Sequence, residues 1–432
     1  CLRAAHSRVL HVSDLNVVHA ASLARIHDRG EARRGSTQGE LDVVADGAVA
    51  IRDGVIVAVG TTAEVLARHD QDVPTIDATG RCVMPGLVEC HSHPLFAGDR
   101  HHEYAERLGG ASLADVAARG GGIWSSVVAT RNAGDEELLT RLSSTVSRIV
   151  AGGVTTLEVK SGYGLTVAEE LRALELLQRA RSLTQMQLVI TFLGAHVVPR
   201  DLDGDAAERA DRYTDLIDGE MLPAVVAQGI AEFQDVTVEE GYFTPAQALR
   251  LMRRSREVGL PVRVHADAWA SSRGWATAVE GGAISAEHLT YTPADEIRQV
   301  GRTDTVAVVL PMAELVYMTS ERANARLFID HEVPVAVATD FCSSIHATSL
   351  LNTVATAAPW FRMTPGEVMV GATLNAAYSL GQQSSCGSLD VGKRGDLIIL
   401  DCPHPDEICL AVGAPLLDHV VIGGAVAIGT VQ

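Results

Sequence analysis

The middle of this 432-residue chain repeats one pattern, and that repeat constrains the fold more than any other feature. A short β-branched run ends in a polar residue and is followed by a stretch in which apolar residues lie three and four positions apart, as in residues 168–180. Alternation of strands with amphipathic helices is typical of α/β proteins. Eight runs of this kind occur, at residues 82–93, 154–163, 187–196, 231–239, 262–267, 283–288, 305–311 and 333–340. Eight strand–helix units predict a (β/α)8 barrel of the TIM type.

A doubly wound parallel sheet is the alternative architecture for alternating strands and helices. That fold commonly has a glycine-rich phosphate loop after an early strand. Neither GxGxxG nor GxxxxGK[ST] occurs in the sequence, so the barrel is the preferred prediction.

Both ends of the chain are rich in β-branched residues. Residues 48–60 resemble a hairpin with Asp53-Gly54 at the turn, and residues 396–401 and 420–428 have the pattern of further strands. Neither end has enough strands to close a sheet alone. We therefore predict a small composite β-sandwich from residues 1–84 and 386–432, with the barrel, residues 85–385, inserted between its two parts.

Composition excludes several kinds of partner. The formal net charge is −19 and the pI is near 5.2, whereas nucleic-acid binding needs a clustered basic face. No window of about eighteen apolar residues is present, and the seven cysteines form no CxxC pair. We expect a cytoplasmic protein with no nucleic-acid or membrane partner, in which a local arginine or histidine meets any small anionic substrate.

Metal-ligand residue types stand where the predicted strands end, which is where such barrels place their catalytic groups. They are His91-x-His93, His196, His265-Ala-Asp267, Glu287-His288 and Thr339-Asp340. His91 and His93 alternate on a strand and point to the same side. An HxH pair alone is weak evidence, but His265 and Asp340 complete a shell of nitrogen and oxygen ligands with room for water, as in catalytic metal sites.

The flanking sequence resembles the amidohydrolase superfamily and, within it, the imidazolonepropionase family. The similarity covers nearly the whole predicted barrel. The matching motifs are Pro85-Gly-Leu-Val88, Gly98-Asp-Arg100, Gly120-Gly-Gly-Ile123, Glu158-Val-Lys-Ser-Gly-Tyr-Gly-Leu165, Thr191-Phe-Leu-Gly-Ala-His196, His265-Ala-Asp267 and Ala338-Thr-Asp-Phe341. The resemblance implies a hydrolase with a two-ended β-sandwich, and commonly a homodimer.

The resemblance also implies a metal site. Its ligands would be His91, His93, His265 and Asp340, holding one divalent ion, with zinc expected and iron or manganese as alternatives. Asp340 would accept the proton that water releases on attack, and His288 would lie near the attacking water or the polarised carbonyl.

Substrate contacts follow from the same resemblance. Arg100, Tyr163 and His196 would hold the substrate ring and its carboxylate, since the arginine fork suits a carboxylate. Lys160 resembles the position that bridges two metals in binuclear relatives, but a single metal is implied here, so we expect Lys160 to play a structural role. Glu239 matches a family acid to which we assign no role.

Three substrate-facing positions depart from the family pattern. Ala268 replaces a glutamate thought to assist proton transfer, Cys342-Ser-Ser344 replaces Asn-Pro-Gly-Ser, and Leu113 replaces a tyrosine. Opening a ring C–N bond expels a basic nitrogen, and general acid help with that step is typically worth about 10²- to 10⁴-fold. The loss at Ala268 therefore argues against unchanged ring opening.

A leaving group that needs no acid would tolerate Ala268, and sulfide is one. A relative within the resemblance removes sulfur from 3-(5-oxo-2-thioxoimidazolidin-4-yl)propionate, a product of ergothioneine breakdown. We therefore favour attack of water at ring C2, giving the hydantoin propionate and hydrogen sulfide.

Three alternatives stay open. The first is imidazolonepropionase activity, which opens 4-imidazolone-5-propionate to N-formimino-glutamate in histidine degradation. The second is an aminohydrolase acting on a purine or pterin ring, and the third is a catalytically inactive amidohydrolase-like scaffold. Cys342 as a nucleophile is disfavoured because no matched base accompanies it in the sequence.

Overall fold

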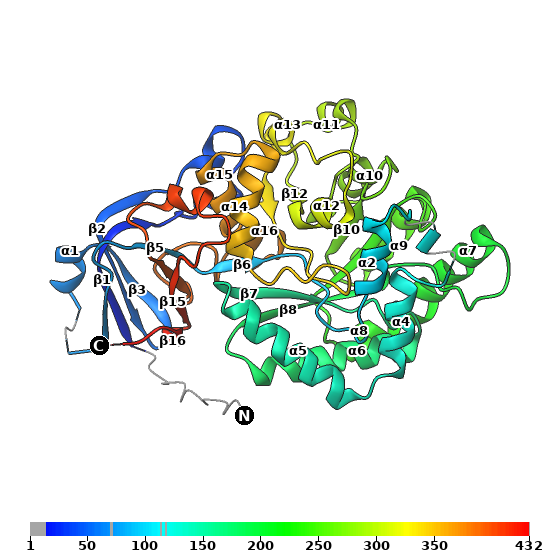
Figure 1. Ribbon diagram of the computed structural model, residues 1–432, viewed down its shortest axis with the longest axis horizontal. Coiled ribbons are helices and arrows are strands. Elements are labelled where there is room, and N and C mark those ends of the chain that lie inside the picture. The colour runs from blue at the N-terminus through cyan, green and yellow to red at the C-terminus, as the bar shows by residue number, and fades with distance from the viewer. Residues whose placement is uncertain (1–13, 70–71, 113–114, 117–118, 432) are drawn as a thin grey trace.

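The structure of the protein is a computed structural model that describes residues 14–69, 72–112, 115–116 and 119–431. Leu113 lies outside the described residues. Figure 1 shows a β-sheet layer on one side of the molecule and a helix-surrounded barrel on the other. Strands from both the blue and the red ends of the chain form the sheet layer.

The barrel has eight parallel strands that neighbour one another in sequence order. They are β6 (Leu87–Glu89), β7 (Val154–Lys160), β8 (Gln187–Ala195), β9 (Phe233–Val238), β10 (Val262–Ala266), β11 (Ser285–His288), β12 (Val306–Val309) and β13 (Val335–Val337). Residues just after β13 and β6 close the ring, since Ser92 forms a parallel bridge with Phe341 and the His93 amide donates to the Phe341 carbonyl at 2.7 Å. Each predicted run contains one of these strands, and the predicted barrel is confirmed.

The first run divides between the two sheets. Its first half is β5 (Cys82–Pro85), which pairs with β1 (Leu15–Ala24) and β14 (Leu397–Leu400) in the sheet layer, and its second half is β6 in the barrel. Gly86 lies at the junction, where a Cβ would stand 2.3 Å from the Thr155 hydroxyl. Because every residue of both strands is buried, hydrophobic periodicity could not separate them.

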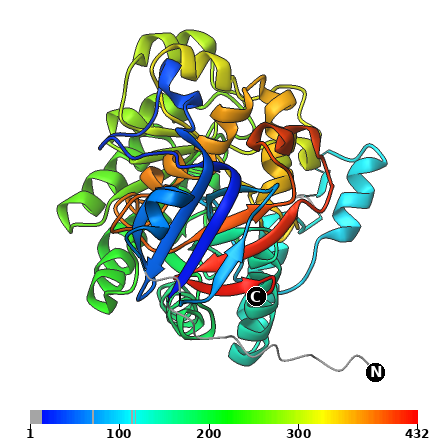
Figure 2. The ribbon, with the colours of Figure 1, turned by 90° about the vertical axis from the view of Figure 1, so that its left-hand side faces the viewer.

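The chain ends pair into one eight-stranded sheet with the order β16-β15-β14-β5-β1-β2-β3, in which β4 also pairs with β1. Its remaining strands are β2 (Val43–Arg52), β3 (Val55–Thr61), β4 (Thr75–Asp77), β15 (Leu417–Ile422) and β16 (Ala425–Ile428). The predicted hairpin turn is present, because Asp53 and Gly54 both have positive φ, of 49° and 76°, as a tight β2–β3 turn requires. Figure 2 shows this sheet facing the viewer, in front of the barrel. The exact domain boundaries stay a prediction.

Helices surround the barrel in Figure 1. They are α2 (His101–Leu108), α4 (Ile123–Asn132), α5 (Asp135–Val150), α6 (Val167–Ala180), α7 (Ala206–Leu216), α8 (Leu222–Gln228), α9 (Pro245–Glu257), α10 (Gly274–Glu280), α11 (Ala294–Val300), α12 (Pro311–Tyr317), α13 (Ala325–Asp330), α14 (Leu350–Phe361), α15 (Pro365–Gly371) and α16 (Leu374–Ser379), while α1 (Thr62–Leu66) follows β3. The helix predicted at residues 168–180 is α6, which Thr166 caps and which buries Leu174 and Leu177. Within the described ranges, no helix is long and apolar enough to cross a membrane.

Candidate metal centre and active site

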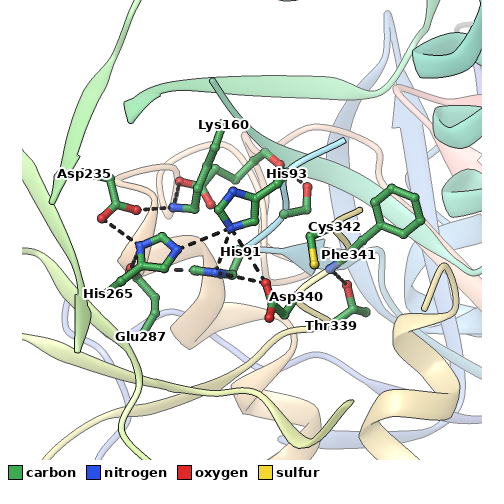
Figure 3. A network of polar contacts seen from close by, with 12 residues as sticks. His91, His93, Lys160, Asp235, His265, Glu287, Thr339, Asp340, Phe341 and Cys342 are labelled. Carbon is green, nitrogen blue, oxygen red and sulfur yellow. Dashed lines mark hydrogen bonds and ion pairs between the residues drawn. The ribbon is translucent and has the colours of Figure 1, made fainter. Parts of the chain in front are cut away.

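Four side chains from three places in the barrel converge at the ends of its strands. His91 and His93 follow β6, His265 lies on β10, and Asp340 follows β13 (Figure 3). The Nε2 atom of His93 lies 3.3 Å from Nε2 of His91 and 3.3 Å from Nε2 of His265. Asp340 Oδ1 lies 3.4 Å from His91 Nε2 and 3.7 Å from His93 Nε2.

This spacing fits a cation better than it fits direct hydrogen bonds. Ligand atoms about 2.1 Å from a tetrahedral zinc ion lie about 3.4 Å from one another, which is the separation observed here. Burial and then the charge of neighbouring groups hold the pKa of His91 and of His93 well below the usual range. Both imidazoles are therefore in the neutral form that binds metals. His91, His93 and Asp340 form one group that could hold an ion, and His91, His265 and His288 form another.

A buried carboxylate orients His265. Asp235 on β9 places its Oδ1 3.0 Å from His265 Nδ1, so that Nε2 of this ring faces the other ligands. Lys160 on β7 donates to Asp235 Oδ2 at 2.6 Å and to Glu158 Oε1 at 2.8 Å, and all three side chains of this ion-pair chain are fully buried. The Lys160 amine therefore forms ion pairs beneath the candidate metal ligands, in agreement with a structural role.

Arg263 extends the same network across the barrel interior. Its guanidinium lies 3.0 Å from Glu158 and 3.0 Å from Glu287, and it also donates to the Cys90 carbonyl at 2.6 Å. Buried charges are stable only when they are paired in this way. We call the four convergent side chains and this ion network the floor of the cavity.

Two site residues have unusual backbone conformations. His288, at the end of β11, has φ of 76°, and Asp340 has φ of 56°. Non-glycine residues adopt this left-handed region at a cost, which the surrounding structure must over-determine. The His288 ring centroid lies 5.3 Å from that of His265 and 5.4 Å from that of His91, so His288 borders the floor. Burial raises the pKa of Asp340 to about 7.

The substrate-binding candidates line one cavity together with His93, His265 and Asp340. The His196 ring stacks on His93 at 5.1 Å, and its Nδ1–H donates to the Gly162 carbonyl at 2.9 Å, which leaves Nε2 as an acceptor. Burial, followed by the charge of His265, lowers the pKa of His196 to about 3, so the ring is neutral. Tyr163 is buried, and its hydroxyl lies 3.4 Å from Ser343 Oγ.

Arg100 is a buried cation on the same cavity. Its side chain is 7% exposed, and its Nε donates to Glu103 at 2.7 Å. Burial disfavours the charge, but Tyr317 and Glu103 outweigh that effect and raise the pKa of Arg100. The guanidinium therefore stays charged and can meet an anionic substrate.

Five of the remaining cavity side chains come from loops and helix ends, and we call these five, with Arg100, the wall. They are Ala268, Trp269, Tyr317, Cys342 and Ser344. The Tyr317 hydroxyl lies 2.8 Å from Ser344 Oγ, which is 3.3 Å from Cys342 Sγ. Burial raises the pKa of the Cys342 thiol to about 11, which opposes a nucleophilic thiolate.

Glu239, at the end of β9, fixes part of this wall. Its Oε2 accepts from the backbone amides of Ala268 at 2.6 Å and Trp269 at 3.1 Å. Its Oε1 accepts from the Ala270 amide at 3.0 Å and the Ser272 hydroxyl at 3.1 Å. With four donors on its two oxygens, this carboxylate holds the loop after β10 in place.

Sequence reasoning missed Asp235, Trp269 and Tyr317. A charged residue within a run predicted to be a buried strand was an available signal for Asp235, because such charges need a partner. Trp269 and Tyr317 pack with ring centroids 4.5 Å apart, but no periodic pattern brings these two loop-edge residues together.

Comparison with known proteins supports the family. The amidohydrolase family model matches residues 82–427, and a bacterial imidazolonepropionase-like composite domain matches residues 47–71. The imidazolonepropionase of Symbiobacterium thermophilum is 40% identical over 415 residues, covering 95% of this chain and 96% of the relative. That of a Bradyrhizobium species is 42% identical over 376 residues, covering 86% and 91%.

Solved structures share the fold. An adenosine deaminase from Xanthomonas campestris with bound zinc superposes with a TM-score of 0.69 at 20% identity, covering 96% of this chain and 93% of its own. Atrazine chlorohydrolase from Arthrobacter aurescens, complexed with zinc, gives a TM-score of 0.70 at 17% identity, covering 96% and 95%. At these identities the likeness concerns the fold alone. The sequence matches go further, and the chain belongs to the amidohydrolase family of metal-dependent hydrolases, in its imidazolonepropionase-like group.

Proposed function

We propose that the protein hydrolyses a five-membered oxo-imidazole-type ring that bears a propionate, and that its reaction is the opening of 4-imidazolone-5-propionate to N-formimino-glutamate. The observation that carries this proposal is one cavity that three of the four proposed metal ligands, His93, His265 and Asp340, line together with the buried Arg100. Relatives named imidazolonepropionase at about 40% identity, cited above, favour ring opening over the desulfurisation that Ala268 suggested.

The donor set suits a divalent ion, with zinc as the first candidate and iron or manganese as alternatives. His91, His93, His265 and Asp340 would hold it, because three imidazoles and one carboxylate are ligands that zinc accepts. When bound, such an ion supplies Lewis acidity and lowers the pKa of a coordinated water to about 7.

The chain's own residues perform the remaining steps in this proposal. Arg100 binds the propionate carboxylate through its guanidinium, while Tyr163 and the Nε2 acceptor of His196 orient the ring. Asp340 accepts the proton released as water adds to the ring carbonyl carbon, and His288 contacts the reacting oxygen. The ring C–N bond then breaks, and the nitrogen that leaves takes up a proton.

That last proton is the reason to keep a second candidate. Ala268 lines the cavity where relatives carry an acid, and Glu239 beside it has both oxygens engaged with the loop. Release of hydrogen sulfide from 3-(5-oxo-2-thioxoimidazolidin-4-yl)propionate needs no acid at this position. Hydrolytic desulfurisation to the hydantoin propionate is therefore the second candidate.

Parallel assays separate the two reactions. The purified protein, loaded with zinc, is incubated with each compound while formimino-glutamate and sulfide are measured. Formimino-glutamate from the imidazolone supports the proposal. Sulfide from the thioxo compound without ring opening of the imidazolone would replace the proposal with desulfurisation. Activity on neither compound, together with no bound metal, would favour an inactive scaffold. The homodimer and the cytoplasmic location stay predictions.

A further inference from the structure

Arg100 is held from one side only. In the described part of the chain it is the one basic lysine or arginine side chain that lines the cavity. Its Nε donates to Glu103 Oε2 at 2.7 Å, whereas among the described residues neither Nη atom has a hydrogen-bond partner. A guanidinium held through Nε keeps its two outer N–H groups for a second, bidentate contact. The geometry thus prepares the fork for a carboxylate in the cavity.

Glu103 also ties Arg100 to the next helix. Its other oxygen, Oε1, accepts from the Gly122 amide at 3.1 Å and from the Ser125 hydroxyl at 3.0 Å. Gly122 has φ of 79° and precedes α4, and a Cβ on Gly121 would lie 2.9 Å from this same oxygen. The glycines at positions 121 and 122 therefore let the chain approach Glu103 closely.

Helix α2, which carries Glu103, depends on such polar contacts. None of its residues is buried, so apolar packing does little to fix it. Besides Glu103, the helix is held by Arg107, which donates to the Tyr317 carbonyl at 2.5 Å and lies over the Tyr317 ring at 5.2 Å. The contacts of Glu103 thus connect a weakly packed helix to the cavity.

We propose that Glu103 is a positioning residue that presents both Nη groups of Arg100 to the substrate carboxylate and, through Gly122 and Ser125, ties Arg100 and α2 to the start of α4. The inference rests on the proposed function for the identity of the carboxylate, and it adds a specificity determinant that touches no substrate atom. Glu103→Gln keeps the size of the side chain, but it replaces the charged acceptor with an amide that cannot serve Arg100, Gly122 and Ser125 equally well.

The test compares two substrates in three proteins: the wild type, Glu103→Gln, and the control Glu106→Gln. Glu106 lies on the same helix and pairs with the exposed Arg119. The substrates are imidazolone propionate and its uncharged propionamide. We expect Glu103→Gln to raise KM for the acid about 10-fold with kcat within about 3-fold, and to leave kcat/KM for the amide unchanged. Equal losses for both substrates, or an equal effect of Glu106→Gln, would overturn the proposal.

A second readout does not depend on turnover. In ¹⁵N-arginine-labelled protein, the Arg100 Nε–H signal, assigned by its absence in Arg100→Lys, should be shielded from solvent exchange in the wild type and in Glu106→Gln. The signal should exchange rapidly in Glu103→Gln. Added glutarate should change its chemical shift only in the two proteins that keep the bond from Arg100 to Glu103. If the wild type turns over neither substrate while this pattern holds, the proposed function is wrong, but Glu103 still positions Arg100. If solvent exchange of the Arg100 Nε–H group is unchanged in Glu103→Gln, Glu103 does not position Arg100, whatever the activity of the variant.

Discussion

The floor and the wall of the cavity are held by different kinds of interaction. The floor lies at strand ends, and its buried charges neutralise one another, as where Lys160 lies between Glu158 and Asp235. In the wall, carboxylates bind the backbone instead. Glu239 accepts hydrogen bonds from amides of the loop after β10, and Glu103 accepts one from the amide of Gly122. The wall's cavity-facing side chains take little part in those bonds.

This difference indicates where substrate specificity can change. Replacing one charge of the floor leaves a partner buried and unpaired, which is costly. A wall residue such as Ala268 donates its backbone amide to Glu239, and any residue except proline supplies that amide. The wall can therefore acquire new side chains while the floor retains its chemistry. The following variants test this division.

The largest effect should come from Asp340→Asn. This change keeps the shape of the side chain but removes the negative ligand and the proton acceptor, so we expect kcat/KM to fall by about a thousandfold or more. Steady-state kinetics with metal content measured by elemental analysis checks this. The control is Asp304→Asn, whose side chain is 96% exposed and should leave activity unchanged. Retention of a tenth of the activity by Asp340→Asn would contradict the assigned role.

Asp235→Asn tests whether the floor network supports the metal. The variant weakens the bond that orients His265 and leaves Lys160 with one anionic partner. We expect zinc affinity to fall about 10- to 100-fold and the free energy of unfolding to fall by about 3–5 kcal/mol. Chelator competition and denaturant unfolding measure the two quantities. Asp215→Asn breaks an exposed pair with Arg250 and should cost under about 1 kcal/mol. Unchanged zinc affinity in Asp235→Asn would remove the supporting role.

The floor was more accessible to sequence reasoning than the wall. His91, His93, His265 and Asp340 stand at strand ends, and parallel strands of a barrel bring their ends to one face, so their meeting followed from the fold. The contacts of Asp235 with His265 and Lys160 did not follow, because they depend on the register of neighbouring strands. Asp235 stands opposite Arg263 in the β9–β10 pair, so that His265 lies two positions further along β10.

The wall has no comparable rule. Trp269 follows β10 and Tyr317 ends α12, and their contact depends on loop paths that carry no periodic signal. The substitution at Ala268 was visible in the sequence, but the hydrogen bond from its backbone amide to Glu239 was not. The division of the 82–93 run into β5 and β6 was also hidden, because both halves are equally buried.

Ala268→Glu should sharpen the contrast by changing only the wall. An acid at this position can protonate the nitrogen that leaves on ring opening, so we expect kcat for the imidazolone to rise about 100-fold, at the lower end of the usual range for general acid catalysis. Ala268→Gln has the same size without the acid and should give no such gain. Sulfide release from the thioxo compound should not accelerate in either variant. Equal rates in the glutamate and glutamine variants would show that protonation by residue 268 does not limit ring opening.

The smallest effect concerns Glu314 on α12, a buried carboxyl that lies outside the floor. The Ala323 amide, the Trp360 indole and the Thr290 hydroxyl donate to it, and in the described chain no cation pairs directly with it. Burial raises its pKa from 4.5 to about 7.

A raised carboxyl pKa means that the folded state binds the proton more tightly, so stability falls as pH rises from 4.5 to above 7. Between pH 6 and 8 ionisation of this group should lower the free energy of unfolding by about 1 kcal/mol. Glu314→Gln should therefore lose about 1 kcal/mol less than the wild type between the two pH values in denaturant unfolding. The matched control Glu321→Gln should retain the slope of the wild type, because it leaves Glu314 in place. An equal fall in stability between pH 6 and 8 in the wild type and in Glu314→Gln would mean that Glu314 is already ionised in the folded state at pH 6.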